Sequence, residues 1–560
     1  MSAGICPDTL PMQNDFGSPD QESTEIRKIA LIRRLEWIVA MALSAVVLFL
    51  LIVRATHAGS LWRDEAESAQ SARMPIGEMF ENIQYSSFPI LFPVVVRAYT
   101  TVFGTSDISL RSFGLATGIL LLAVAWLPSR RLSGGVPLLM PAMIGLNVNF
   151  LVAGTGLRGY GLGSFLVILA FVFTVRLLLD PSALSLVAVF LAYLASLQCL
   201  FLSVSLVAAI IIAALGVLLI RRELKLIWLL MCIALVCAFS YISYLLQFYF
   251  SGRSWAKVIQ VPVSFGLIWP HFVSAWGEIS REVSMIWLGL ILLSLVGAVC
   301  RLATIWSNHR RPERDFLLFG ILLIPLSMIA SYAFVEVLPR PPDERYFLAL
   351  TVLVAATADL IWANFPPWLR VVRIVPLVFA TITLPFAIWG YIVQAESNAE
   401  TIAKIVEQNA APRDLIVVNP WSFGVSFNWY YHGAARWMTV PAIEDHRIHR
   451  YDLVLAKMEA ASPLADVEAE IENVLESGGR VWFAGQLEVP VAGESPAQVG
   501  PAPDPNIGWS GSAYRKAWSQ QISLFLVRHV QKGNPVDTRS WATISAREIF
   551  SLYELEGWKY

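Results

Sequence analysis

Long apolar segments separated by short polar ones make up most of the first 394 residues. A transmembrane helix needs roughly 20 predominantly apolar residues, and about eleven segments meet this requirement on hydropathy alone. They are 36–53, 108–127, 136–153, 160–179, 182–199, 201–220, 226–246, 283–301, 315–335, 345–363 and 374–394. The crowded region 136–220 also allows other divisions. The pattern therefore predicts a polytopic α-helical membrane protein.

The basic residues between these segments predict how the chain is oriented. The clusters are "RKIALIRR" before the first segment, Arg130 and Arg131 after the second, "RRELK", "NHRRPERD", and "WLRVVR" before the last. If the segments alternate in direction, all five clusters fall on one face, which the positive-inside rule makes cytoplasmic. The opposite face, periplasmic in a bacterium, then carries the loops 54–107, 154–159, 247–282 and 335–345, and everything from 395 onward.

The loop 54–107 contains two further helical patterns. "RDEAESAQSARMP" reads as a short helix that ends before Pro75. "FPILFPVVVRAYTTVFG" is apolar but is interrupted by Pro93 and Arg97, which favours an amphipathic helix on the membrane surface. If it were a span instead, every later loop would change sides and the arginine clusters would lie outside.

The two ends of the chain differ from the apolar region. Residues 1–30 are polar and rich in turn formers, which predicts a disordered cytoplasmic tail before a membrane domain of 31–394. In 395–560, helical patterns alternate with the short apolar segments "LIVVN", "RVWFAG" and "ISLFLVRH", which are typical of strands. The helix "PLADVEAEIENVLESGG" should end at Gly478 and Gly479. We expect a periplasmic α/β domain.

Composition agrees with a membrane location. Hydrophobic residues make up 56% of the chain and charged residues only 15%, and the mean hydropathy is +0.60; roughly 25% charged residues is usual in soluble proteins. The net charge is −1 and no basic stripe is present, so nucleic-acid binding is not expected. The five cysteines show neither disulfide nor metal-ligand spacing.

Asp64 and Glu65 are the most informative polar residues because they follow the first span closely. One interpretation is a solvated loop whose acids pair with Arg63 or Arg73. However, ionisable groups at a membrane boundary are costly unless they are used. A carboxylate there can accept a proton from an incoming hydroxyl or amine, and apolar surroundings would raise its pKa in part.

With its neighbours, "LWRDEA" resembles the acidic signature of the GT-C glycosyltransferases. This superfamily includes protein O-mannosyltransferases, lipid A aminoarabinose transferases and rhizobial core galacturonosyltransferases. Four later stretches are also similar to segments of this family, in the same order along the chain and on the same side of the membrane. They are "FPILFPVVVRAYTTVFGTSDISLRSFGLATGILLLAV", "GTGLRGYGLGSFLVILA", "PRPPDERYFLALTVLVAA" and "APRDLIVVNPWSFGVSFNWYYHG". The chain departs from the pattern at Gly159, where proline is common, and at Gln198, where a histidine is often found.

The resemblance implies transfer of a sugar from a polyprenyl-phosphate donor to a lipid, glycan or protein acceptor of the cell envelope, with inversion. Asp64 would be the general base, and Glu65 would orient it or the sugar. The leaving phosphate needs cations. Arg158 and Arg345 are the candidates, beside Tyr160 and Tyr346, although these arginines could equally anchor helix ends in the headgroups. No cofactor is certain. A divalent cation is possible, and Gln198 leaves it in doubt.

Several other polar residues stay open. Asp107 and Arg111 are favoured as a structural pair over a direct catalytic role. Asp343 and Glu344 form a second acidic pair that could assist the site but more often would face solvent. His432, His446 and His449 show no ligand trio.

The aromatics of "NPWSFGVSFNWYYHG" could stack on sugars or dock the C-terminal domain onto the membrane domain. Two other functions compete with the transferase. A transporter would show repeats and ionisable residues at span centres, and a scaffold would not need acids so close to the first span.

Overall fold

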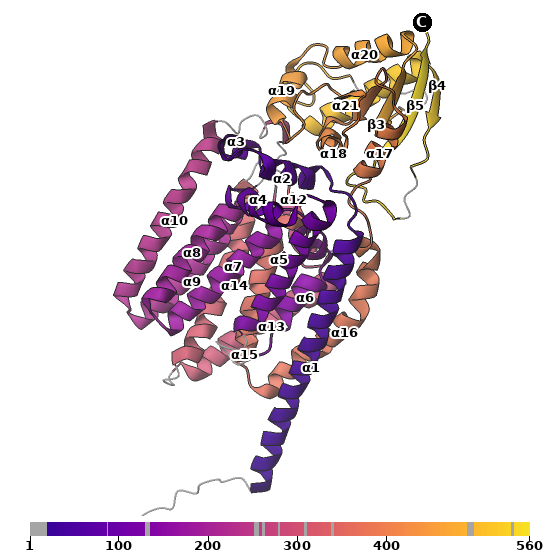
Figure 1. Cartoon of the computed structure of the whole chain (residues 1–560). Helices are drawn as coiled ribbons and strands as arrows, with labels where there is room; N and C mark the ends of the chain where they lie inside the picture. Colours follow the sequence, from indigo (N-terminus) through magenta and orange to yellow (C-terminus); the bar gives the residue numbers. More distant parts are fainter. Residues whose placement is uncertain are drawn as a thin grey trace, which may run out of the picture.

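The computed structural model describes residues 19–86, 88–128, 135–250, 257–259, 264–277, 281–306, 311–337, 341–489, 498–538 and 542–560. In these ranges a bundle of long helices carries a smaller α/β domain at one end (Figure 1). Nine of the described helices are long and apolar enough to cross a membrane. They are α1 (Pro19–His57), α5 (Asp107–Pro128), α7 (Gly159–Leu179), α9 (Ser203–Arg221), α10 (Leu224–Phe250), α13 (Arg281–Ile305), α14 (Arg311–Val337), α15 (Leu348–Ala363, after the 3-10 turn η4, Glu344–Phe347) and α16 (Pro367–Ile392). The predicted polytopic helical class is confirmed.

Two predicted boundaries change. The segment 182–199 forms the apolar helix α8 (Ala183–Cys199), which has only 17 residues. The first helix begins at Pro19, so residues 19–30 of the predicted disordered tail are helical, while 1–18 lie outside the described residues. Proline suits the first position of a helix, and the Glu, Gln, Arg and Lys that follow are good helix formers.

The predicted span 136–153 is interrupted. It forms the short helix α6 (Leu139–Gly145) and then the π-helix η3 (Phe150–Gly154). Between them the side chain of Asn147 donates to the carbonyl of Ala275 at 2.8 Å and accepts the amide of Asn149 at 3.0 Å. Such side-chain hydrogen bonds replace those of a regular helix, and the expectation of one continuous helix is wrong here.

The interrupted segment still passes through the bundle from one end to the other. The amide of Leu138 donates to Asp359, near the end of α15 that points away from the α/β domain. The amide of Leu157 donates to Glu65 in the loop beneath that domain. The segment therefore extends from one end of the bundle to the other without forming a continuous helix.

Buried ion pairs collect at the end of the bundle opposite the α/β domain. Arg373 lies 3.0 Å from both Glu36 and Asp359, and Arg221 lies 2.6 Å from Asp315. Buried charges of this kind are stable only when paired. One group joins α1 with the end of α15 and the start of α16, and the other joins the end of α9 to the start of α14. The basic clusters that the described residues include therefore lie at one end of the bundle, as alternating spans require.

Shorter helices lie across the other end of the bundle, beneath the α/β domain (Figure 1). They are α2 (Arg63–Arg73), α3 (Ile76–Asn82), the 3-10 turn η1 (Ile83–Tyr85), α4 (Leu91–Phe103) and α12 (Phe265–Ser274). As predicted, α2 ends before Pro75. α4 buries Phe92 and Val96 on one face, and Arg97 donates to the carbonyl of Met74 at 2.6 Å.

The C-terminal residues form a five-stranded sheet in the order β2-β1-β3-β5-β4. The parallel strands are β1 (Leu415–Asn419), β2 (Arg436–Thr439) and β3 (Arg480–Gly485), and the antiparallel ones are β4 (Val530–Pro535) and β5 (Ser551–Trp558). Alternate residues of β1 face two apolar cores. α19 (Tyr451–Glu459), α20 (Ala465–Glu476) and α21 (Gly511–His529) cover one face, and α17 (Ala399–Asn409) and α18 (Gly424–Tyr430) cover the other. The α/β domain is confirmed.

One predicted strand of this domain is a helix. "ISLFLVRH" forms the end of α21, which buries Tyr514, Trp518, Ile522 and Leu526. These residues recur every four positions, which is the helical period. The segment "ISLFLVRH" alone does not show this period, because it begins after Tyr514 and Trp518, the first two of the four buried residues.

Two glycines permit close helix crossings in the membrane domain. A Cβ on Gly114 of α5 would lie 1.7 Å from the carbonyl oxygen of Thr155, and one on Gly161 of α7 would lie 1.9 Å from that of Gly154. Gly390 of α16 has no atom within 4 Å of such a Cβ. The backbone of the interrupted segment 145–158 therefore packs directly against the helices α5 and α7.

We expect Gly114→Ala and Gly161→Ala each to destabilise the protein by about 1–3 kcal/mol or more, because backbone must move. Thermal unfolding of the detergent-purified chain measures this. Gly390→Ala is the matched control and should leave the melting temperature unchanged or raise it, since alanine favours a helix over glycine. Equal melting temperatures for all three variants would contradict the packing.

Candidate functional site between the membrane domain and the α/β domain

α2 presents three acidic residues, Asp64, Glu65 and Glu67, within its first turns. Carboxylates are favoured at this end of a helix by its dipole. α2 also docks the α/β domain: Gln70 donates to the carbonyl of Val425 at 3.1 Å and accepts from Asn428 at 2.6 Å. The helix that carries the acids is thus held from above by α18.

Glu65 anchors α2 and faces away from the cavity described below. Its Oε1 lies 2.6 Å from Nη1 of Arg111 and accepts the amide of Leu157 at 2.9 Å. Arg111 also donates to the carbonyls of Gly59 and Ser60, at 3.1 and 2.9 Å. Consecutive helix residues point about 100° apart, so Glu65 does not share the direction of Asp64, and we no longer expect it to orient the base or the sugar.

The expected pairing of Asp107 with Arg111 is wrong. Arg111 is engaged by Glu65, whereas Asp107 accepts a hydrogen bond from the hydroxyl of Tyr430 at 2.7 Å. The same hydroxyl accepts the amide of Leu61 at 2.7 Å. Both residues remain structural, but each connects the second span to a different part of the molecule.

Asp64 lies between two arginines and a histidine from distant parts of the chain. Its Oδ2 is 3.6 Å from Nη2 of Arg158 and 3.4 Å from Nη1 of Arg345, and its Oδ1 is 3.3 Å from Nε2 of His449. Because an ionised carboxylate only accepts, Nε2 of His449 is the donor. Arg158 also donates to the backbone carbonyl of Asp64 at 2.6 Å.

These contacts decide the protonation state of Asp64. Burial acts to raise the pKa of the carboxyl, but Arg158, the hydrogen bond from His449 and Arg345 outweigh it and hold the pKa well below 3.8. The expectation of a partly raised pKa is therefore wrong for the protein without substrate. Asp64 is a carboxylate at any physiological pH.

The four residues expected near a donor phosphate come together around Asp64. Arg158 precedes α7 and lies over the ring of Phe88 at 4.7 Å. Arg345, in η4, lies 5.9 Å from the ring centres of both Tyr160 and Tyr346. The four side chains thus lie together, and their role in binding a donor phosphate remains a prediction.

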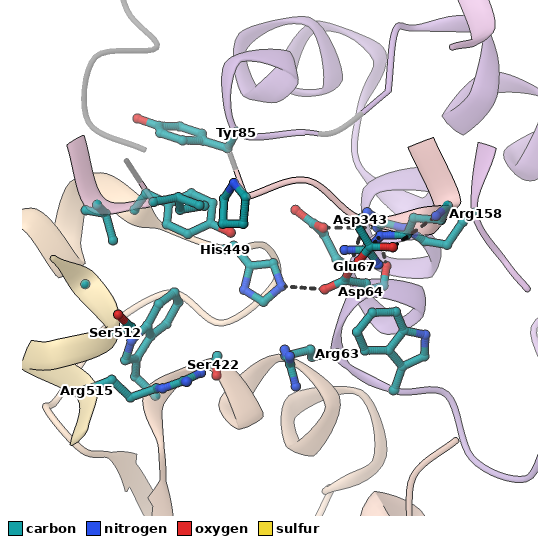
Figure 2. A pocket seen from close by; sticks show the side chains of 18 of the residues that line it. Arg63, Asp64, Glu67, Tyr85, Arg158, Asp343, Ser422, His449, Ser512 and Arg515 are labelled. Atoms are coloured by element: carbon teal, nitrogen blue, oxygen red, sulfur yellow. Dashed lines mark hydrogen bonds and ion pairs between the residues drawn. The ribbon is translucent and has the colours of Figure 1, made fainter. Parts of the chain in front are cut away.

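These side chains line a cavity of about 450 Å³ between the end of the bundle and the α/β domain (Figure 2). The membrane domain contributes Trp62, Arg63, Asp64, Glu67, Tyr85, Arg158, Tyr160, Pro341, Pro342, Asp343, Arg345 and Tyr346. The α/β domain contributes Trp421, Ser422, His449, Tyr451, Ser510, Gly511, Ser512 and Arg515. Its mixed aromatic and charged lining suits a sugar and an anion together.

Sequence reasoning did not place Glu67 or His449 beside Asp64. Glu67 lies 3.4 Å from Nη1 of Arg158, and its spacing of three residues from Asp64 on one helix face was an available signal. His449 gave no such signal, since 385 residues separate it from Asp64. It reaches the site because Ile448 packs on Met74 and Met79 below it.

The other candidates divide between the site and its surroundings. Asp343 lies 3.2 Å from Nε of Arg345, inside the cavity, whereas Glu344 pairs with His271 at 2.7 Å. His446 packs on Trp437 with ring centres 4.5 Å apart, and burial lowers its pKa to about 4.

The aromatic segment docks the α/β domain onto the membrane domain, and one of its aromatic residues faces the cavity. Trp421 lines the cavity, while Tyr430 bonds Leu61 and Asp107 of the membrane domain. Trp429 lies under Arg73, 5.1 Å from its guanidinium carbon. The segment therefore lines the cavity at one end and docks the domain at the other.

A divalent cation does not fit the described residues of this cavity. Asp64, Glu67 and Asp343 each lie within 3.6 Å of an arginine nitrogen. No group of three or more His, Cys, Asp or Glu able to hold a metal occurs among the described residues. Gln198 lies apart from the cavity lining, donates to Ser240 at 3.2 Å and accepts from Tyr244.

Comparison with known proteins gives structural matches only. No family model and no curated protein matches the chain. A crystal structure of ArnT from Cupriavidus metallidurans bound to undecaprenyl phosphate matches with 12% identity and a TM-score of 0.45, covering 80% of this chain and 93% of that one. The apo structure of the same protein matches with 14% identity and a TM-score of 0.35, covering 80% and 92%.

Similarity at this level of identity and TM-score carries no argument about activity. The function proposed below rests on the residues of this chain.

The low pKa of Asp64 has a measurable consequence for stability. A carboxyl whose pKa is lower in the folded than in the unfolded state stabilises the fold above the unfolded value, and this contribution is lost as the pH falls through the folded pKa. We expect the difference in melting temperature between wild type and Asp64→Asn to stay constant down to about pH 5 and to shrink only below about pH 4. In an Arg158→Gln background the decline should be smaller and should end at a higher pH, because the folded pKa of Asp64 then lies closer to its unfolded value. A difference that already closes between about pH 5 and 7 in the wild-type background would contradict the low pKa.

Proposed function

We propose that this protein is a membrane glycosyltransferase that moves a sugar from a polyprenyl-phosphate donor to a cell-envelope lipid, glycan or protein. Asp64 is the general base. The observation that carries the proposal is the buried, ionised carboxylate of Asp64 held between Arg158 and Arg345 in a cavity at the end of the membrane spans. A carboxylate base, two guanidinium groups suited to a phosphate, and a cavity large enough for a sugar occur together there.

The reaction is a displacement at the anomeric carbon with inversion. The acceptor hydroxyl or amine gives its proton to a carboxylate oxygen of Asp64 as its oxygen or nitrogen bonds to that carbon. The bond from the anomeric carbon to the phosphate oxygen breaks, and its electron pair leaves with the lipid phosphate. Arg158 and Arg345 stabilise the charge that gathers on this phosphate, as planar guanidinium groups match its oxygens.

Donor binding also prepares the base. Without substrate, the two arginines depress the pKa of Asp64 and make it a weak proton acceptor. A donor phosphate that shares Arg158 and Arg345 partly neutralises them, so the pKa of Asp64 rises towards the value at which a carboxylate accepts a proton effectively.

The position of the cavity suits a lipid-borne sugar. Arg158 and Arg345 lie directly at the starts of the spans Gly159–Leu179 and Glu344–Ala363, where a lipid headgroup meets water. With the basic clusters at the opposite end cytoplasmic, the N-terminus lies in the cytoplasm and the cavity and α/β domain lie in the periplasm of a bacterial inner membrane.

The direct test is lipid and envelope-glycan mass spectrometry of a strain that lacks the gene. We expect one sugar to be missing, to be restored by the wild-type chain, and not to be restored by Asp64→Asn. In purified membranes Asp64→Asn should lower transfer by about 10²–10⁴-fold, the usual contribution of a general base.

Glu81→Gln is the matched control, because Glu81 is an exposed acid of the same loop outside the cavity. It should restore the sugar fully, and size-exclusion chromatography should show Asp64→Asn folded like it. An envelope unchanged by the deletion, or full activity of folded Asp64→Asn, would favour a transporter or a scaffold instead.

A further inference from the structure

The wall of the cavity formed by the α/β domain ends in the first turn of α21, which spans 19 residues. Its N-cap residue, Ser510, makes no side-chain capping bond. Among the hydrogen bonds of the described residues, none uses the amide of Gly511 or of Ser512, and both residues line the cavity. Free amides at the positive end of a helix dipole are donors for an anion.

Ser422 provides a second, independent feature on the same wall. Its side chain is only 7% exposed, its Oγ has no hydrogen-bond partner among the described residues, and it lines the cavity. A buried hydroxyl without a partner is costly, so such groups usually meet a ligand or water. Ser422 comes from the segment after β1, not from α21.

Arg515 completes this group of residues. It lies one helical turn after Gly511 and therefore faces the same side of α21. Figure 2 shows its guanidinium extending towards Ser422. Desolvation and the nearby cation Arg63 lower the pKa of Arg515, while Glu488 acts to raise it, and the residue as a whole remains exposed to solvent.

The other three arginines of the cavity differ in this respect. Arg158 and Arg345 face Asp64, and Arg63 lies 3.4 Å from Glu548. None of the salt bridges among the described residues involves Arg515. Among the described residues, Arg515 is thus the arginine of the cavity with no carboxylate within salt-bridge distance, and Glu488 acts on it from further away.

We propose that the first turn of α21, Arg515 and Ser422 form an oxyanion subsite that binds a phosphate or carboxylate group of the acceptor. The subsite rests on the proposed function only in assigning the anion to the acceptor, because the donor phosphate is placed at Arg158 and Arg345. This subsite specifies the class of acceptor, namely one with an anionic group next to the hydroxyl or amine that attacks the sugar.

The test is direct titration of the detergent-purified full-length chain with inorganic phosphate and, separately, acetate, followed by tryptophan fluorescence since Trp421 lines the cavity. Inorganic phosphate can also occupy the donor end, so the titrations use the Arg158→Gln background. There Arg515→Gln should weaken anion binding about tenfold or more, the loss of a charged hydrogen bond, and Ser422→Ala should weaken it less. Preference for phosphate or for acetate identifies which oxyanion the subsite takes.

Lys516→Gln is the matched control, because Lys516 is the exposed neighbour on α21 outside the cavity. It should bind both anions as the parent does. Anion affinity unchanged by Arg515→Gln would overturn the subsite.

A second arm measures the binding of a short-chain polyprenyl phosphate to the wild-type chain and to the single variants Arg515→Gln and Arg158→Gln. If Arg515→Gln weakens its binding more than Arg158→Gln does, the subsite belongs to the donor and the assignment to the acceptor is wrong. Both arms measure binding alone. They therefore stay decisive even if Asp64→Asn proves active and the proposed transferase reaction fails.

Discussion

The structure of the site depends on one buried cluster, in which the carboxylate of Asp64 meets the guanidinium groups of Arg158 and Arg345. Burying a carboxylate or a guanidinium alone is strongly unfavourable, and pairing offsets this only at close range. The cluster therefore requires that α2, the start of α7 and the start of α15 meet at one end of the bundle. The same requirement leaves the carboxylate ionised and facing a cavity.

The α/β domain is part of this site because a second set of contacts fixes it there. Arg54, at the end of the first span, pairs with Glu396, which follows the last span, and both are buried. Tyr430 ties the domain to the loop below through Leu61 and Asp107. The first and last crossings thus define where the domain sits, so that eight of the 22 residues lining the cavity come from beyond residue 420.

The sequence predicted what depends on local pattern and missed what depends on packing. Hydropathy located the spans and the α2 pattern, because length and apolarity are properties of single segments. It could not foresee the break at Asn147, whose partner Ala275 lies 128 residues away. The adjacent acids Asp64 and Glu65 could not be distinguished in the sequence. In the helix they point in different directions, Asp64 into the cavity and Glu65 towards Arg111. The contact of His449 with Asp64 could not be predicted, because no residue near His449 in the sequence indicates it.

The electrostatics of the cavity favour an ordered reaction. In the proposed reaction, the arginines assigned to the leaving phosphate are also the groups that keep the pKa of Asp64 low before substrate binds. An acceptor that enters first meets a carboxylate with little tendency to take its proton. A donor phosphate competes with Asp64 for Arg158 and Arg345, and this competition makes the carboxylate more basic only when a reactive anomeric carbon is present. The same ion pairs that stabilise the empty site therefore restrain the base until the donor is bound.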